Sequence, residues 1–124
     1  MCGIAGFIGR APIPQGYEFG KVLDKIKHRG PDASGSMIFN QNKGMLGHTR
    51  LSIQDLSDAS VQPFQRDQLT VTFNGEIYNF KELREELSSY GYRFATTGDT
   101  EVVLAAYQHW DIECFNRFNG MWAM

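Results

Sequence analysis

The chain has 124 residues, 42% hydrophobic and 13% aromatic, and a formal net charge of −2. This length fits one domain or part of one, and the apolar content is ample for a packed core. Scattered basic residues argue against nucleic-acid binding, and no apolar run approaches the ~20 residues that span a membrane. The two cysteines, Cys2 and Cys114, make no disulfide framework. We therefore expect a reducing, cytoplasmic compartment, no signal peptide and, without a Cys/His pair at ligand spacing, no metal site.

Cys2 directly follows the initiator methionine, an unusual place for a structural thiol. Removal of Met1 would leave a thiol and a free α-amine on one residue, and an α-amine ordinarily titrates close to neutral pH. Cys2 could then supply both nucleophile and general base, as an N-terminal Thr does in other hydrolases. The alternative is an ordinary small residue on a buried strand, and position alone favours it.

The first half of the chain predicts a strand, a helix and a strand pair. Residues 3–9 form an apolar, glycine-rich strand, and apolar residues at three- and four-residue steps predict a helix over 17–27. Residues 36–41 and 44–50 predict the strand pair, which ends at Arg50. That guanidinium either makes a surface ion pair or binds a carboxylate bidentately. We expect residues 51–68 to be a long connection, a kind of segment that is often functional.

Polar residues between these elements have two interpretations. Residues 28–35 break the helix at Gly30-Pro31 and form either a polar loop or the wall of a site. His48, within the second strand of the pair, is interpreted as a hydrogen-bonded structural histidine, because no second metal-binding group lies near it in sequence.

The second half predicts a strand followed by two helices. Residues 69–74 alternate as a strand, and a capping-box-like Asn79 begins a helix that Gly91 ends. Asn74-Gly75 alone would favour a hairpin, but the helical pattern that follows places it at a strand-to-helix corner. There a side-chain amide and a glycine N–H can donate together to one anion, as an oxyanion hole requires.

The last segments add a helix and a strand. Asp99 precedes a helix whose apolar stripe runs to Trp110, and its carboxylate can cap that helix, meet a substrate ammonium, or do both. Cys114 is expected to be buried packing. Residues 118–124 are apolar and uncharged, which predicts the start of a strand and a piece of a longer chain.

Five motifs in this order and spacing resemble a known family: Cys2-Gly3-Ile4, Arg29-Gly30-Pro31-Asp32, residues 47–53 (Gly-His-Thr-Arg-Leu-Ser-Ile), residues 73–79 (Phe-Asn-Gly-Glu-Ile-Tyr-Asn) and Gly98-Asp99-Thr100-Glu101. Together they resemble the N-terminal glutaminase domain of glutamine-hydrolysing asparagine synthetase, a class II glutamine amidotransferase, over essentially the whole chain. The resemblance implies an α+β, N-terminal-nucleophile hydrolase fold. That fold has two stacked antiparallel sheets between helical layers (αββα), here cut short within residues 1–124.

The resemblance also implies roles for nine residues. Cys2 attacks the glutamine carboxamide, and its own α-amine carries the proton. The Asn74 side chain and the Gly75 N–H stabilise the oxyanion. The other six bind the substrate: Arg50 its α-carboxylate, Glu76 and Asp99 its α-ammonium, and Leu51, Ile53 and Gln54 the rest of the pocket through backbone groups. Gln54 departs from the family, which usually has an apolar residue there.

The implied function is hydrolysis of L-glutamine to glutamate and ammonia through a thioester. The ammonia would serve ATP-dependent asparagine synthesis from aspartate. ATP and magnesium would belong to a C-terminal synthetase domain in cis, which these residues lack, so no cofactor is expected in this domain. Two alternatives stay open: an amidotransferase acting on another carboxylate, such as a surface-sugar acid, or a non-catalytic glutamine-binding fragment that retains Met1. No nucleic-acid or membrane partner is implied, and a homodimer is left open.

Overall fold

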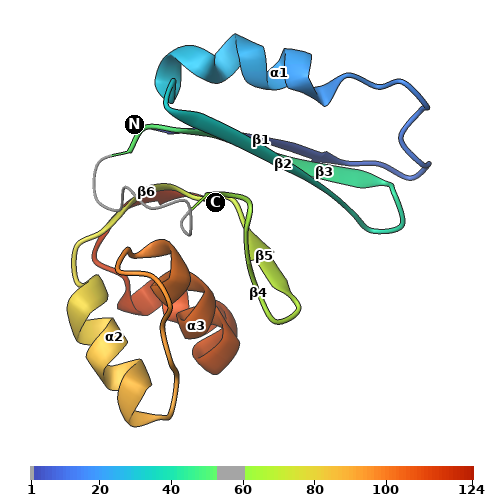
Figure 1. The fold of residues 1–124 in the computed structure, drawn as a ribbon. Coiled ribbons are helices and arrows are strands. Elements are labelled where there is room, and N and C mark those ends of the chain that lie inside the picture. The colour runs from blue at the N-terminus through green and yellow to red at the C-terminus, as the bar shows by residue number, and fades with distance from the viewer. Residues whose placement is uncertain (1, 53–60) are drawn as a thin grey trace.

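The computed structural model describes residues 2–52 and 61–124 (Figure 1). Its helices are α1 (Phe19–Ile26), α2 (Phe80–Ser89) and α3 (Thr100–Trp110), with 3₁₀ turns at Lys27–Arg29 and Asp111–Arg117. Its strands are β1 (Gly3–Ile8), β2 (Ala33–Phe39), β3 (Gly44–Arg50), β4 (Phe64–Arg66), β5 (Leu69–Val71), β6 (Asn74–Ile77) and β7 (Gly120–Ala123). None of the helices in these residues is long and apolar enough to cross a membrane.

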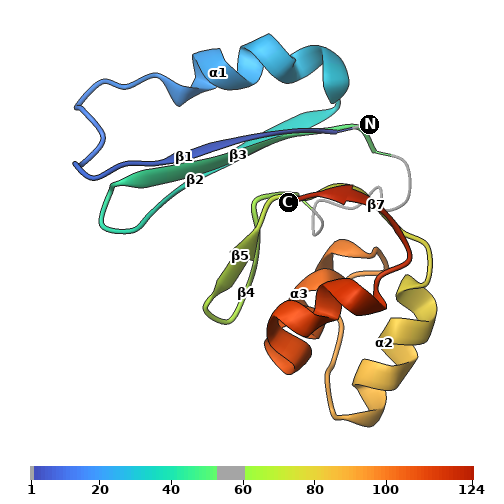
Figure 2. The same cartoon turned by 180° about the vertical axis from the view of Figure 1, so that it is seen from behind.

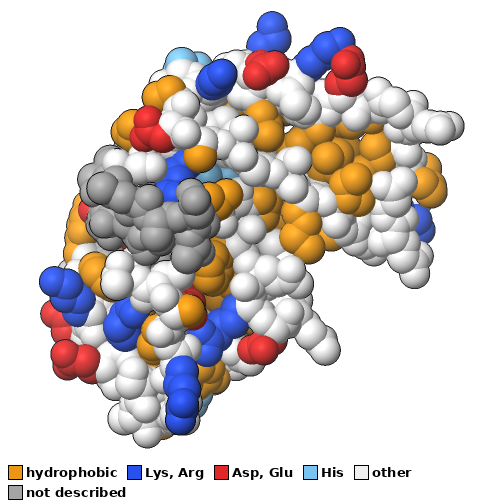
Figure 3. Space-filling view, viewed as in Figure 1, with side chains coloured by type: hydrophobic (Ala, Val, Ile, Leu, Met, Phe, Trp, Pro, Cys, Tyr) orange, Lys and Arg blue, Asp and Glu red, His pale blue; other side chains and the backbone are white. Residues whose placement is uncertain are grey.

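The N-terminal part is an antiparallel sheet in the order β1-β3-β2, with α1 lying along one face (Figures 1 and 2). Phe19 and Leu23 on α1 pack with Met45 of β3 in a small core. Gly47 of β3 makes this approach possible, because a Cβ there would lie 2.5 Å from the Phe19 ring. In the space-filling view, hydrophobic side chains gather over this sheet and charged ones over α1 (Figure 3).

The C-terminal part holds the larger core, built by α2, α3 and the strands beside them. Leu83 and Leu87 on α2 face α3, whose residues 100–106 are all buried. β6 pairs with β7 from the end of the chain, so Asn74 lies opposite Ala123. β4 and β5 form a separate antiparallel hairpin.

The structure confirms the α+β class with antiparallel sheets. It also confirms the N-terminal strand, the helix within 17–27, the strand pair, the two later helices and the final strand. Within the described residues the strands form one three-stranded and two two-stranded sheets.

Three element predictions were wrong in part. β2 begins at Ala33 rather than residue 36, because β3 supplies ladder partners as far as Arg50. β4 lies inside the predicted connection 51–68. Asn74 begins a strand rather than ending one at a corner, since β7 provides a partner that no local pattern reveals.

The two predicted helix caps also differ from the structure. Neither Asn79 nor Asp99 makes a side-chain capping bond, although each directly precedes its helix. Asn79 Oδ1 instead accepts the N–H of Asn119 at 2.9 Å, and its Nδ2 donates to the carbonyl of Arg117 at 3.0 Å. Asp99 binds the N–H of Ile77. Both side chains therefore form hydrogen bonds with a distant segment of the chain.

Candidate active site

Cys2 lies half-buried at the start of β1, against the end of β3. Its Sγ accepts the N–H of Leu51 at 3.4 Å and its thiol faces the Leu51 carbonyl at 3.7 Å. Its own carbonyl accepts Nε of Arg29 at 3.1 Å. The next residue, Gly3, could carry no side chain here, because a Cβ would lie 2.6 Å from Thr49 Oγ1. The Cys2 thiol is therefore held against Leu51, the residue that follows Arg50.

The segment from Arg29 to Asp32, interpreted above as loop or site wall, closes around this end of β3. A Cβ at Gly30 would lie 2.2 Å from the Thr49 carbonyl oxygen, so only glycine lets the backbone pass. The N–H of Asp32 donates to the Arg50 carbonyl at 3.0 Å, and its carboxylate accepts the N–H of Ser52 at 2.7 Å. The segment therefore forms one wall beside Cys2.

Arg50 ends β3 and is 7% exposed. Burial lowers the local dielectric around a guanidinium, which strengthens its bond to an anion. Its positive charge also helps to lower the pKa of His48, two residues earlier, after the larger effect of burial. Arg50 is thus a buried cation that directly precedes Leu51, the residue that contacts the Cys2 thiol.

Asn74 and Gly75 occupy adjacent positions on β6, both half-buried. Gly75 pairs with Trp122, and a Cβ at Gly75 would lie 2.1 Å from the Met121 carbonyl oxygen and 2.6 Å from Trp122 Cα. A larger residue would therefore push β7 away. Glycine is required here because of the β6–β7 pairing. The same pairing holds the Gly75 backbone in place, adjacent to Asn74.

Glu76 and Asp99 form a carboxylate pair. Asp99 is 8% exposed, and its Oδ2 accepts the N–H of Ile77, the residue after Glu76, at 3.0 Å. Burial raises the pKa of Asp99, and the negative charge of Glu76 raises it further, while backbone hydrogen bonds act in the opposite direction. Because the two negative charges act on each other, a cation bound beside them would be stabilised.

These residues come in two groups, one at the end of β3 and one on β6 and directly before α3. His48 of β3 joins them, because it is hydrogen-bonded to the backbone of Phe73, the residue before Asn74. Figure 1 shows the N-terminal end of the upper sheet on the side of β6. Leu51 belongs to the first group through its contacts with Cys2. Ile53 and Gln54 lie outside the described residues.

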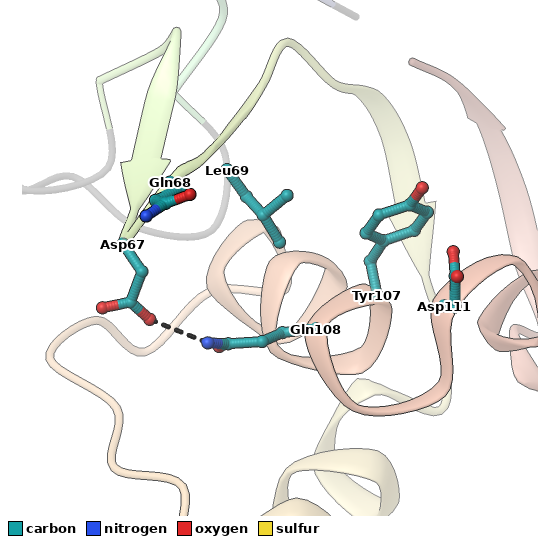
Figure 4. A pocket seen from close by; sticks show the side chains of 6 residues that line it. All are labelled: Asp67, Gln68, Leu69, Tyr107, Gln108 and Asp111. Carbon is teal, nitrogen blue, oxygen red and sulfur yellow. Dashed lines mark hydrogen bonds between the residues drawn. The ribbon is translucent and has the colours of Figure 1, made fainter.

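A separate cavity of about 520 Å³ lies between the β4–β5 turn and the end of α3 (Figure 4). Gln108 donates across it to Asp67 at 3.0 Å. The cavity is lined by Asp67, Gln68, Leu69, Tyr107, Gln108 and Asp111. None of these is a site residue predicted from the sequence. Within residues 2–52 and 61–124, no three His, Cys, Asp or Glu side chains group as metal ligands.

Sequence reasoning assigned no role to two residues that contact the site. Arg29 belongs to the Arg29-Gly30-Pro31-Asp32 motif, but the spacing of that motif does not indicate that Arg29 binds the carbonyl of Cys2. Gln62 bonds the backbone of Phe73 from within the long connection. No local pattern could have found it, because its partners lie 11 and 38 residues further along the chain.

Comparison with known proteins shows relatives that match the chain over its whole length. The family model described as "Glutamine amidotransferase domain" matches residues 1–124. "Asparagine synthetase [glutamine-hydrolyzing] 1" of Bacillus subtilis is 40% identical over 99% of this chain and 20% of its own length. A putative asparagine synthetase of Methanocaldococcus jannaschii is 39% identical, with 27% of its length covered. "Amidase chry2" of Gibberella zeae is 35% identical, with 20% covered.

The chain thus spans about a fifth to a quarter of the length of these relatives. The match extends over every residue that carries the candidate site, because it runs from one end of the chain to the other. The chain therefore belongs to the glutamine amidotransferase domain family, of class II, and is homologous to the N-terminal region of asparagine synthetases.

Proposed function

We propose that this domain hydrolyses glutamine to glutamate and ammonia, with Cys2 as the nucleophile. One observation carries the proposal. The Cys2 thiol is held at the end of β3 by Leu51, immediately beside the buried Arg50, in a chain that belongs to the amidotransferase family. A nucleophile next to a carboxylate-binding cation is what an enzyme acting on an amino-acid side chain needs.

The proposed reaction uses both functional groups of an N-terminal Cys2. After removal of Met1, which lies outside the described residues, the α-amine takes the thiol proton as Sγ attacks the carboxamide carbon. The Asn74 amide and the Gly75 N–H then stabilise the tetrahedral oxyanion, a type of donor whose loss typically costs ~3–4 kcal/mol. The C–N bond breaks, ammonia leaves with the proton returned by the amine, and a thioester remains. Water, deprotonated by the same amine, hydrolyses the thioester to glutamate and restores the thiol.

The charges of the site support glutamine as the substrate. Arg50 would bind the α-carboxylate, and Glu76 and Asp99 would bind the α-ammonium. Burial is the main cause of the raised pKa of Asp99, and the Glu76 charge adds to it. A bound ammonium would stabilise the ionised carboxylate against both effects. Backbone groups of Leu51, and of Ile53 and Gln54, would complete the pocket.

We further propose that the ammonia serves ATP-dependent asparagine synthesis from aspartate, by a synthetase domain in cis that would bind ATP and magnesium. The names of the bacterial and archaeal relatives support this acceptor. An amidotransferase with a different acceptor is the second candidate, favoured by the match to fungal amidases over 99% of the chain. The complete two-sheet, four-layer N-terminal-nucleophile fold and a cytoplasmic location belong to the same proposal.

The test is intact-mass analysis after incubation with 6-diazo-5-oxo-norleucine, an electrophilic glutamine analogue, together with an assay for glutamate release. We expect a mass without Met1 that carries one adduct, mapped to Cys2. Cys2→Ala should lose the adduct and turnover while keeping the circular dichroism of the wild type. The matched control is Cys114→Ala, since Cys114 is fully buried and distant in sequence from every site residue.

Two outcomes would contradict the proposal. Wild-type turnover in Cys2→Ala would remove the nucleophile assignment. Retained Met1 together with glutamine binding and no hydrolysis would favour a binding domain in place of an enzyme.

A further inference from the structure

Gln62 is a buried polar residue for which the proposed reaction has no use. It is 6% exposed, and both ends of its side-chain amide have partners. Its Oε1 accepts the N–H of Phe73 at 2.5 Å, and its Nε2 donates to Thr100 Oγ1 at 3.4 Å. One partner directly precedes Asn74 and the other directly follows Asp99. A single side chain therefore links the two segments that carry the predicted oxyanion and ammonium groups.

The Phe73 backbone needs such a partner. β5 ends at Val71 and β6 begins at Asn74, so residues 72 and 73 lie between two sheets and outside both ladders. Phe73 is 3% exposed, which keeps water away from its N–H. A buried N–H without a partner is costly, and the strand would shift to satisfy it. By accepting the Phe73 N–H, Gln62 removes the need for the strand to shift at the residue before Asn74.

Gln62 is itself anchored to the N-terminal sheet. A Cβ at Gly35 of β2 would lie 2.2 Å from the Gln62 carbonyl oxygen, so the two backbones are in close contact. Gly35 is paired with His48 of β3, which is hydrogen-bonded to the backbone of Phe73. The N-terminal sheet, which carries Arg50 and contacts Cys2, is therefore linked to Phe73 directly by His48 and indirectly by Gln62.

We propose that Gln62 is a positioning residue that sets Asn74 and Gly75 relative to Cys2 through Phe73, and Asp99 through Thr100. The proposal rests on the proposed glutaminase function for its kinetic consequence. A side-chain amide suits the task because it offers an acceptor and a donor at once without charge. Methionine is of similar size and offers neither hydrogen bond, whereas glutamate keeps the oxygen that accepts the Phe73 N–H.

The test compares Gln62→Met, Gln62→Glu and the control Gln65→Met in the full-length protein. Gln65 is exposed on β4, three residues further along. Since small displacements of catalytic groups cost on the order of 100-fold in rate, we expect Gln62→Met to lower kcat for glutamine about 10- to 100-fold. Gln62→Glu should lose less kcat than Gln62→Met but raise KM, because Asp99 loses its support through Thr100. Gln65→Met should match the wild type.

Amide hydrogen exchange is measured on the same variants and needs no activity. We expect Gln62→Met to speed exchange in peptides covering residues 72–77 and 97–102 and to leave the rest of the chain unchanged. Exchange and kcat within twofold of the wild type would overturn the proposal. Faster exchange throughout the chain would show a merely structural role and overturn it equally. An inactive wild type would refute the glutaminase function, and the exchange pattern alone would then decide the role of Gln62.

Discussion

The fold lowers the pKa of His48 well below its ordinary value. His48 is 1% exposed, and burial lowers its pKa from 6.5 to about 4, with the nearby Arg50 charge acting in the same direction. The hydrogen bond to the Phe73 backbone acts in the opposite direction but does not compensate. His48 is therefore neutral at physiological pH, which fits a structural histidine between the two groups of site residues.

This shift predicts how stability depends on pH. Between pH 6.5 and 4 the unfolded chain binds a proton at His48 and the folded chain does not. The contribution of neutral His48 to the free energy of unfolding is therefore complete above pH 6.5. It declines as the pH falls from 6.5 towards 4, by about 2 kcal/mol at pH 5. Urea unfolding at pH 8 and at pH 5 measures this. From pH 8 to pH 5, the free energy of unfolding of His48→Gln should fall by about 2 kcal/mol less than that of the wild type.

The control for this prediction is His28→Gln, because His28 is exposed in the 3₁₀ turn after α1. Its pH dependence should follow that of the wild type. Equal losses in the wild type and in His48→Gln would show that burial of His48 does not control acid stability.

At the scale of elements, the contact of α1 with β3 depends on the absence of a side chain at Gly47. An alanine Cβ there would lie 2.5 Å from the Phe19 ring and 2.7 Å from Leu23. Both side chains form the small core with Met45, so the helix would have to lift. Gly47→Ala should therefore lower the free energy of unfolding by about 1–3 kcal/mol, as overpacking does. Denaturant titration measures this.

A second glycine provides the matched comparison on the same helix. Gly20 lies in α1 and is exposed, and a Cβ added there would meet no atom within 4 Å. Gly20→Ala should stabilise the domain by about 0.5 kcal/mol, since alanine loses less backbone entropy in a helix. Equal effects of the two substitutions would contradict the packing of α1 on β3.

At the scale of the whole molecule, a buried ion pair ties β4 to α3 and to the segment that leads to Asp99. Glu101, at 6% side-chain exposure, accepts from Arg66 at 2.9 Å. Its carboxylate also accepts the N–H of Thr96 at 2.8 Å and that of Ala95 at 3.0 Å. Arg84 holds the same segment by donating to the Thr96 and Gly98 carbonyls.

Breaking this pair should be expensive. Glu101→Gln leaves the Arg66 charge without its anion, and loss of one partner of a buried pair typically costs about 3–5 kcal/mol. The control is Glu86→Gln, which breaks the exposed pair with Arg117 and should cost less than about 1 kcal/mol. Thermal and urea unfolding measure the free energy of unfolding of both variants. Similar losses in Glu101→Gln and Glu86→Gln would show that the Glu101 ion pair contributes no more than the exposed one.

Much of the fold and of the candidate site could be predicted from local pattern. The strand at 3–9, the helix within 17–27 and the helix ended by Gly91 follow from side-chain periodicity and punctuation, which act within a few residues. β6 could not be predicted, because its partner β7 is distant in sequence, with Asn74 paired to Ala123. The linking role of Gln62 was equally hidden, since its hydrogen bonds depend on which segments the core brings together.

The sequence by itself determined the family, the α+β class and the set of candidate site residues, because motif order and hydrophobic periodicity are properties of the linear chain. Only the tertiary structure decided how those residues are held. It placed Leu51, 49 residues away, against the Cys2 thiol, and it brought the N–H of Ile77, 22 residues earlier, to the Asp99 carboxylate. Such contacts depend on packing between distant segments, because buried backbone groups bond whichever partner the core brings within reach.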